Sequence, residues 1–237
     1  QAVSPNVGPT ACTTGLSCGL VGYWTFDGKD TNWATNKTND LSGNGNTGTL
    51  TNMSTTTSPA PGKVGQGLRF DGVNDFVKFT TDMVGTNSMS FTAWVYIDTL
   101  SNTASQSNPS LINNGKLVIS LLHLGSGKVF NIRYTGNSTY TYNNMATSSS
   151  NAWSFNKWFF VAVTRDRINL VANIYSNGVL SGTANQPIAA PVVGSNALAI
   201  GGSVFSSREL QGRLDDVRVY NKVLSATEIM QLYNMGR

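Results

Sequence analysis

Short runs of β-branched and aromatic residues, bounded by glycine and asparagine, recur along most of the chain. They lie at residues 20–26, 67–70, 76–79, 90–97, 117–123, 129–134, 158–164, 169–175, 197–200 and 214–220. Runs of this length with such boundaries are typical of β-strands. About ten strands with almost no helix predict an all-β fold, a two-sheet antiparallel sandwich.

Local signals predict two tight turns and one helix. Asn177-Gly178 and Asn114-Gly115 are candidates for type I′ hairpin turns, because both residue types tolerate positive φ. Ser225 and Glu228 form a capping-box pattern ahead of Ile229. We therefore expect a short helix at the C-terminal end.

Residues 1–19 are predicted to be an irregular leader, because Pro5, Pro9 and several glycines block regular structure. Residues 20–237 contain no internal repeat or linker and are predicted to form one domain. The two cysteines, Cys12 and Cys18, frame a small loop that a disulfide could close. Two free thiols are the alternative. A disulfide would place the protein outside the cytoplasm.

Composition excludes several classes of function. Charged residues make up only 12% of the chain, and its net charge of +4 comes from scattered lysines and arginines. We find no basic run suited to tracking phosphates, so nucleic acid is not an expected partner. No apolar stretch approaches the ~20 residues of a membrane span.

Several motifs follow one another along residues 20–236. They are Tyr23-Trp24-Thr25-Phe26-Asp27, the segment 40–50, Gly67-Leu68-x-Phe70-Asp71-Gly72, Trp158-Phe159-Phe160-Val161-Ala162-Val163-Thr164, and Leu214-Asp215-Asp216-Val217-Arg218-Val219-Tyr220. They resemble the motifs of laminin-G-like domains, which belong to the concanavalin A-like lectin/glucanase superfamily. The resemblance implies a jelly roll whose first and last strands lie side by side.

The same resemblance implies a calcium site, because such domains often hold one Ca²⁺ near the first and last strands. Asp27 would then lie close to Asp215 and Asp216. Residue types give separate support: Asp40, Asn44 and Asn46, with Ser42, offer oxygens at every second position, and Ca²⁺ prefers oxygen ligands. A structural role in ion pairs or turns is the alternative.

Strand alternation places Asp215 on the same face as Val217 and Val219, directed toward the core. A carboxylate in that position needs a cation or hydrogen-bond donors, and Arg213 or Arg218 could supply the charge instead of calcium. Asp216 is expected at the surface or held by a neighbouring loop.

Catalytic patterns are absent from the sequence. Retaining glucanases of the superfamily carry Glu-x-Asp-x-x-Glu, and the only glutamates, Glu209 and Glu228, do not fit that pattern. The single histidine, His123, lies in an apolar run and has no evident acidic partner. The sequence therefore predicts a protein that is not an enzyme.

Binding sites for sugars use aromatic faces with nearby polar groups. Trp24, Trp94 and Trp158 fall in strand motifs and are expected in the core. The ligand candidates are the aromatic residues of polar or loop segments: Trp33, Tyr134, Tyr140, Tyr142 and Trp153.

The sequence thus predicts a secreted or cell-surface binding module with lectin-like recognition and a structural calcium site. Its ligand would be a glycan or an extracellular protein. A module with this function could also be one part of a larger multidomain surface protein. The alternatives are a glycosidase or lyase of the same fold and an inert structural or adhesion spacer.

Overall fold

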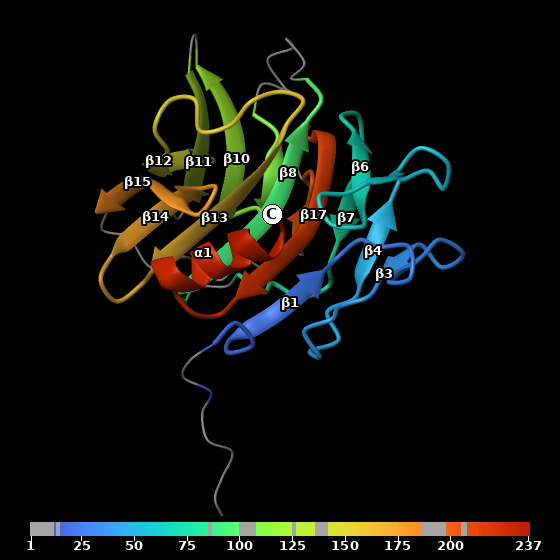
Figure 1. Cartoon of the computed structure of the whole chain (residues 1–237), viewed down its shortest axis with the longest axis horizontal. Helices are drawn as coiled ribbons and strands as arrows, with labels where there is room; N and C mark the ends of the chain where they lie inside the picture. Colours follow the sequence, from blue (N-terminus) through green and yellow to red (C-terminus); the bar gives the residue numbers. More distant parts are fainter. Residues whose placement is uncertain are drawn as a thin grey trace, which may run out of the picture.

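The computed structural model describes residues 12, 15–84, 87–99, 108–124, 127–135, 142–185, 198–204 and 208–237. Their strands form two sheets, here called sheet A and sheet B, and every strand pair is antiparallel (Figure 1). The predicted all-β, jelly-roll sandwich is confirmed.

Sheet A has the strand order β15-β14-β13-β8-β17-β6-β5, and β1 pairs with β17 outside that path. Its strands are β1 (Leu20–Trp24), β5 (Pro59–Pro61), β6 (Gln66–Asp71), β8 (Met89–Ile97), β13 (Trp158–Asp166), β14 (Val171–Ser176), β15 (Val179–Asn185) and β17 (Gln211–Tyr220).

Sheet B has the strand order β12-β11-β10-β9-β16-β7-β4-β3-β2. Its strands are β2 (Thr31–Asn32), β3 (Lys37–Thr38), β4 (Gly48–Thr51), β7 (Phe76–Lys78), β9 (Ser110–Asn113), β10 (Leu117–Leu124), β11 (Gly127–Thr135), β12 (Tyr142–Thr147) and β16 (Ala199–Ile200).

The core lies between the two sheets and is built from rows of apolar residues that cross the strands. One row in sheet B consists of Ile132, Ile119, Ile112, Ile200, Val77 and Leu50, joined through the pairing of neighbouring strands. These side chains are buried in one cluster with Phe91 and Val217 of sheet A. The row shows how period-2 alternation directs one face of each strand inward.

The helix α1 (Ala226–Met235) covers part of the outer face of sheet A (Figure 1). Ser225 and Glu228 form the predicted capping box at its start. Ile229 and Leu232 are buried in a second cluster that includes Trp94 and Phe160. Among the residues that the structure describes, no helix has the length and apolar character needed to cross a membrane.

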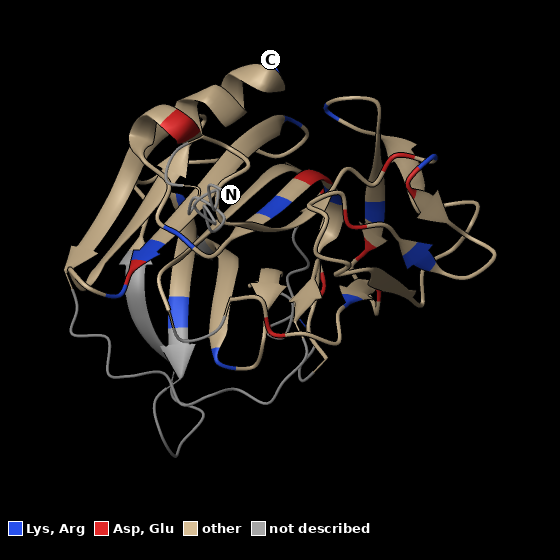
Figure 2. Ribbon diagram, turned by 90° about the horizontal axis from the view of Figure 1, so that it is seen from below, with Lys and Arg blue, Asp and Glu red and all other residues tan. Residues whose placement is uncertain are grey.

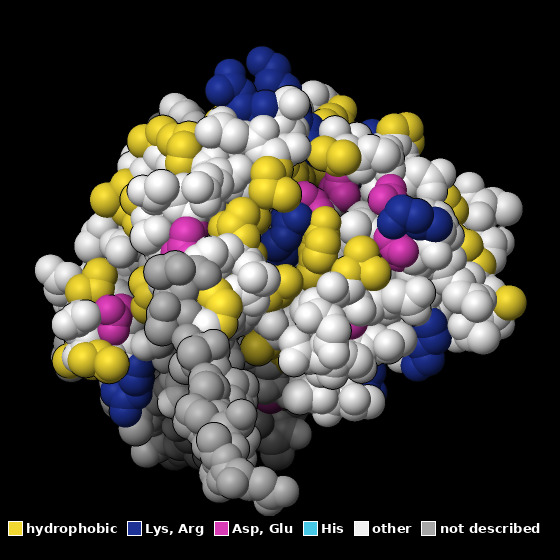
Figure 3. Space-filling view, turned by 60° about the horizontal axis from the view of Figure 1, so that its bottom comes forward, with side chains coloured by type: hydrophobic (Ala, Val, Ile, Leu, Met, Phe, Trp, Pro, Cys, Tyr) yellow, Lys and Arg dark blue, Asp and Glu magenta, His cyan; other side chains and the backbone are white. Residues whose placement is uncertain are grey.

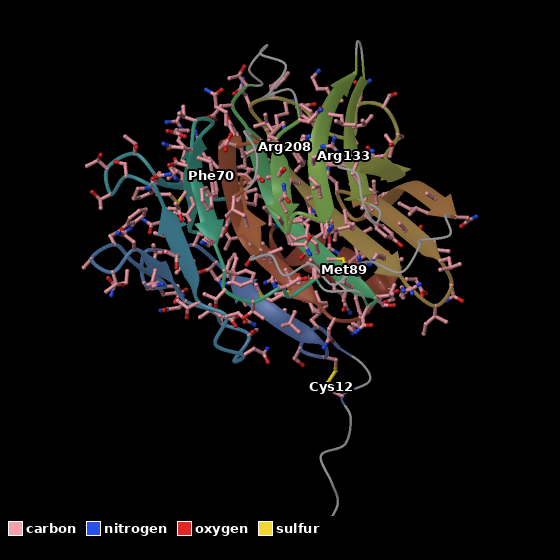
Figure 4. All side chains as sticks on the ribbon, turned by 180° about the vertical axis from the view of Figure 1, so that it is seen from behind. Cys12, Phe70, Met89, Arg133 and Arg208 are labelled. Atoms are coloured by element: carbon pink, nitrogen blue, oxygen red, sulfur yellow. A yellow bond between two sulfur atoms is a disulfide. The ribbon has the colours of Figure 1, made fainter. Side chains whose placement is uncertain are left out.

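The first and last strands lie side by side, as the family resemblance implied, because β1 pairs with β17. Cys12 and Cys18 form a disulfide just before β1 (Figure 4). The predicted pairing of the two cysteines is therefore confirmed.

Other local predictions need correction. Asn177 and Gly178 both have positive φ, as a type I′ turn requires, but at Asn114-Gly115 only Gly115 does. Residues 27–48, which contain none of the predicted strand runs, include β2 and β3. These two-residue strands are too short to produce a hydrophobic alternation in the sequence.

Candidate functional site

The adjacent acids of β17 lie on a β-bulge. Asp215 pairs with Trp94, whereas Arg218 pairs with Thr92, and the register shifts between them. Asp216 has φ of +55°, in the left-handed region. A bulge inserts an extra residue into one strand and interrupts its alternation.

The bulge turns Asp215 away from the core. The side chains of Leu214, Val217 and Val219 all belong to the core cluster. Val217 lies three positions after Leu214, and simple alternation would place residues at that spacing on opposite faces. Asp215 instead shares the outer face of sheet A with its partner Trp94. The prediction that Asp215 faces inward with Val217 and Val219 is therefore wrong, because simple alternation does not hold across the bulge.

Backbone amides hold the Asp215 carboxylate. Its Oδ2 accepts hydrogen bonds from the N–H groups of Lys63 at 2.7 Å and Val64 at 2.8 Å. Burial raises the pKa of Asp215 to about 7; the charges of Asp216 and Asp27 add to the rise, and the two amides offset part of it. Asp215 forms no ion pair with Arg213 or Arg218 within the described residues, so neither arginine supplies the charge that was the alternative to calcium.

Asp216 is buried and joins the first strand to the last. Its Oδ1 accepts a 2.7 Å hydrogen bond from the Tyr23 hydroxyl, and its Oδ2 lies 3.0 Å from Nη1 of Arg218. The Arg218 guanidinium in turn lies 4.0 Å from the centre of the Tyr23 ring. The expectation of a surface or loop-held Asp216 is wrong, because its partners belong to β1 and to its own strand.

Asp27 lies beside the segment 62–66 that also holds Asp215. Its Oδ1 accepts a 2.8 Å hydrogen bond from the Gln66 N–H. A Cβ atom at Gly65 would lie 2.5 Å from that same Oδ1, and one at Gly62 would lie 2.6 Å from Oδ2 of Asp215. The two glycines thus allow the backbone to approach both carboxylates, and the structure brings Asp27, Asp215 and Asp216 into one region.

Asp40, Asn44 and Asn46 have a different role. The Asp40 carboxylate accepts hydrogen bonds from the backbone N–H groups of Tyr23, Ser42 and Asn46, and also from the Ser42 hydroxyl. The Asn44 and Asn46 amides donate to the carbonyl groups of Leu20 and Val21.

These bonds fix the loop 40–46 to β1. No hydrogen bond in the described part of the chain links this loop to Asp27 or Asp215. Within the same residues, no group of three or more His, Cys, Asp or Glu side chains is arranged to hold a metal ion. A calcium site would therefore need backbone oxygens as well as the Asp27 and Asp215 carboxylates.

The predicted ligand aromatics are dispersed. Trp153 is 2% exposed, belongs to the core and donates from Nε1 to the Val129 carbonyl at 3.2 Å. Its assignment as an exposed ligand contact is wrong. Trp33 is half-buried, with one side against the core. Tyr134 and Tyr142 lie on β11 and β12, where only their backbone is described, and Tyr140 lies outside the described residues.

A different set of side chains forms an open row on the outer face of sheet A, here called the Trp158 row. It consists of Trp158, Tyr96, Arg213 and Arg69, one residue from each of β13, β8, β17 and β6, in direct register. All four side chains are half-buried. The expectation that Trp158 lies in the core is therefore wrong.

The members of the Trp158 row contact one another. The ring centroids of Trp158 and Tyr96 are 5.5 Å apart in an edge-to-face arrangement. The Arg213 guanidinium lies 4.6 Å from the centre of the Tyr96 ring. Asp98 lies beside both arginines, with Oδ2 3.2 Å from Nε of Arg69 and Oδ1 3.9 Å from Nη2 of Arg213.

Strand geometry explains why this row remains open. Phe160 lies two positions after Trp158 on β13, and its partner Trp94 lies two positions before Tyr96 on β8. Both Phe160 and Trp94 are covered by α1. Successive outward residues of a strand are two positions apart, so the Trp158 row is the next outward row. All four side chains of the row remain partly exposed, and Trp158 packs at the edge of the cluster beneath α1. Tyr96, Arg213 and Arg69 could not be identified as members of this row from the sequence, because only the strand register brings them beside Trp158.

The charged residues are otherwise dispersed. Lysines and arginines are interspersed with aspartates and glutamates over the described ribbon (Figure 2). The face in Figure 3 shows the same mixture among hydrophobic and uncharged side chains. The Trp158 row is thus distinguished by its aromatic and arginine content rather than by a large area of one charge.

Comparisons with known proteins concern the fold. A laminin-G family model described as "Concanavalin A-like lectin/glucanases superfamily" matches residues 71–230. Domain 4 of a GH43 extracellular arabinanase from Geobacillus stearothermophilus, solved in complex with arabinotriose, is 20% identical with a TM-score of 0.68, covering 90% of this chain and 98% of that domain. A search of curated proteins finds no match.

Toxin binding domains have a similar fold. That of Paraclostridial Mosquitocidal Protein 1 is 17% identical with a TM-score of 0.69, covering 93% of this chain and 53% of the other. That of botulinum neurotoxin DC, in complex with SialylT, is 17% identical with a TM-score of 0.60, covering 94% and 53%. The present chain therefore spans about half of these toxin domains.

Proposed function

The chain belongs to the concanavalin A-like lectin/glucanase superfamily, and from this premise we propose that it is a non-catalytic module that binds carbohydrate. One observation carries the proposal: the Trp158 row presents half-buried aromatic rings and arginines on an open sheet face. Sugars pack their C–H groups on aromatic rings and bind polar side chains through their hydroxyls. Two structures of similar fold contain arabinotriose and SialylT, which supports a sugar ligand.

The positions of the two glutamates support a non-catalytic function. Glu228 caps α1 and is bound by Lys222 Nζ at 2.6 Å. Glu209 is buried in the segment before β17. Neither glutamate belongs to a carboxylate pair of the Glu-x-Asp-x-x-Glu type.

A glycan array tests this function. Wild-type protein should bind a defined group of glycans, and Trp158→Ala should lose that binding because the ring that the sugar packs on is removed. Trp33→Ala is the matched control, since Trp33 is also half-buried but lies outside the row. Release of reducing ends from any bound polysaccharide would show an enzyme instead. Absence of binding to every glycan would favour the extracellular-protein ligand or the structural spacer.

We also propose a structural Ca²⁺ held by Asp27 and Asp215 with oxygens of the neighbouring backbone. The support is geometric: the Asp215 and Asp27 carboxylates both accept hydrogen bonds from the segment 62–66, and glycines of that segment bring its backbone close to them. An acidic group of this kind is stabilised by a cation. When bound, Ca²⁺ would supply positive charge, while Asp215 fixes the segment 62–66 to β17 and Asp27 fixes it to the residues that follow β1.

Thermal melting in Ca²⁺ and in EDTA tests the ion. Binding to the folded state alone stabilises it by about 2.7 kcal/mol at a hundredfold excess over Kd. Asp215→Asn should abolish the calcium-dependent rise in Tm. Asp40→Asn should lower Tm but retain the rise, because Asp40 serves the loop 40–46. The same Tm for wild type in millimolar Ca²⁺ and in EDTA would contradict the site.

We propose that the module acts outside the cytoplasm, secreted or at a cell surface. The Cys12–Cys18 disulfide supports this location, since disulfides persist in oxidising compartments.

A further inference from the structure

Arg213 occupies a fixed position in the centre of the Trp158 row. It lies between Tyr96 and Arg69 in the strand register, and its guanidinium is 4.6 Å from the Tyr96 ring centre. A cation over an aromatic face is attracted by the ring quadrupole, so this contact orients the side chain before any ligand arrives.

The hydrogen-bonding capacity of Arg213 is unused by the described protein. Its Nε is buried and has no acceptor, and the closest carboxylate oxygen lies 3.9 Å from Nη2, beyond hydrogen-bond distance. A guanidinium carries five N–H donors. The side chain is 26% exposed, so a part of it other than Nε faces solvent.

The charges around Arg213 leave an excess of positive charge. Arg69 binds Asp98 at 3.2 Å and thereby compensates that carboxylate. The two arginines and one aspartate together retain one positive charge. The next acid along β6, Asp71, accepts hydrogen bonds from the N–H groups of Val73 and Asn74 in its own turn.

We propose that the Trp158 row recognises an acidic sugar, with the ring packed on Trp158 and the sugar carboxylate bound by the Arg213 guanidinium. Arginine is suited to this because its planar fork matches a carboxylate through two parallel hydrogen bonds. Trp158 and Arg213 lie two strands apart, which corresponds to about 10 Å. A single oligosaccharide can therefore contact both. This inference rests on the proposed function and names the ligand class of the same row.

Matched acidic and neutral ligands test the inference. Calorimetric titrations would use oligogalacturonate, a glucuronate-containing oligosaccharide and sialyllactose, each compared with its carboxyl methyl ester. At least one acidic ligand should bind about tenfold or more tightly than its ester, because esterification removes a charge-assisted hydrogen bond. The preference should weaken as NaCl is raised.

Variants then assign the preference to Arg213. Arg213→Gln should remove the difference between acid and ester, and Arg213→Lys should restore part of it, since a lysine keeps the charge without the fork. Lys116→Gln, on the β9–β10 turn of sheet B, removes the same charge elsewhere and should change nothing. Melting curves of all variants check that they are folded.

The outcomes separate the two claims. Equal affinity for every acid and its ester, an unchanged preference in Arg213→Gln, or equal binding of a sulfated neutral oligosaccharide would overturn the carboxylate inference. If neutral glycans bind through Trp158 while acidic ones do not, the inference fails and the proposed function stands. If wild type binds no glycan at all, both fail.

Discussion

The hydroxyl of Tyr23 donates a 2.7 Å hydrogen bond to Oδ1 of Asp216, and these residues are 193 positions apart in the chain. The bond connects β1 to the bulge of β17, where Asp216 also binds Arg218. Burial raises the pKa of Tyr23 above its ordinary value, so the phenol retains its proton and remains a donor. A buried network of this kind ties the beginning of the fold to its end.

Tyr23→Phe should destabilise the fold by about 1–3 kcal/mol, because it leaves the buried Asp216 oxygen without its hydroxyl donor. Urea unfolding measures the change. Tyr233→Phe is the matched control: Tyr233 stacks on Trp94, with centroids 5.6 Å apart, and its ring is retained. That control should stay within about 0.5 kcal/mol of wild type. Equal losses in both variants would contradict a specific role for the Tyr23–Asp216 bond.

Asp75 predicts a distinct pH dependence. Burial raises the pKa of this carboxyl from 3.8 to about 6, and Asp71 adds to the rise. Folding thus favours the protonated form of Asp75. The contribution of this group to the free energy of unfolding is complete below pH 3.8 and is lost as the pH rises through about 6. Asp75→Asn cannot ionise, so its stability relative to wild type should increase between about pH 4 and pH 7, by at most about 3 kcal/mol.

Asp166→Asn is a control of opposite sign. Hydrogen bonds from the backbone and side chain of Asn169 lower the pKa of Asp166, with burial opposing them. Its carboxylate therefore stabilises the fold above the ordinary pKa and loses this effect as the pH falls. Urea unfolding at several pH values should show Asp166→Asn losing stability relative to wild type as the pH rises to about 4 and staying level above it, whereas Asp75→Asn gains stability between about pH 4 and pH 7. Parallel curves for the two variants would refute both assignments.

Trp153 and Trp158 should respond in opposite ways to replacement by phenylalanine. Trp153→Phe removes a buried Nε1 hydrogen bond and core volume, so stability should fall by about 1–3 kcal/mol. Its glycan affinity should remain that of wild type. Trp158→Phe should weaken glycan binding with little change in stability, because its side chain is half-buried on the sheet face. Reduced glycan affinity of the Trp153→Phe variant, measured at a temperature where the variant is folded, would show that Trp153 belongs to the ligand site.

Much of the fold follows from local patterns in the sequence. Runs of β-branched and aromatic residues located β8, β13 and β17, and the capping box located the start of α1, because these signals depend on residues within a few positions of each other. The two-residue strands β2 and β3 leave no such pattern and were missed.

The site could be predicted only in part for the same reason. The motif resemblance correctly brought Asp27 near Asp215, but alternation gave Asp215 the wrong face because the bulge at Asp216 interrupts it. The Trp158 row depends on register between strands that are distant in the chain. No local spacing in the sequence relates Trp158 to Tyr96 and Arg213.

NMR titration of ¹⁵N-labelled protein with the tightest glycan ligand tests the central claim most directly, because the five tryptophans give five separate indole N–H signals. The account predicts that the Trp158 signal shifts with saturation, while those of the core residues Trp24 and Trp153 remain in place. A saturable shift of Trp33 with no change at Trp158 would contradict it and place the ligand elsewhere on the protein.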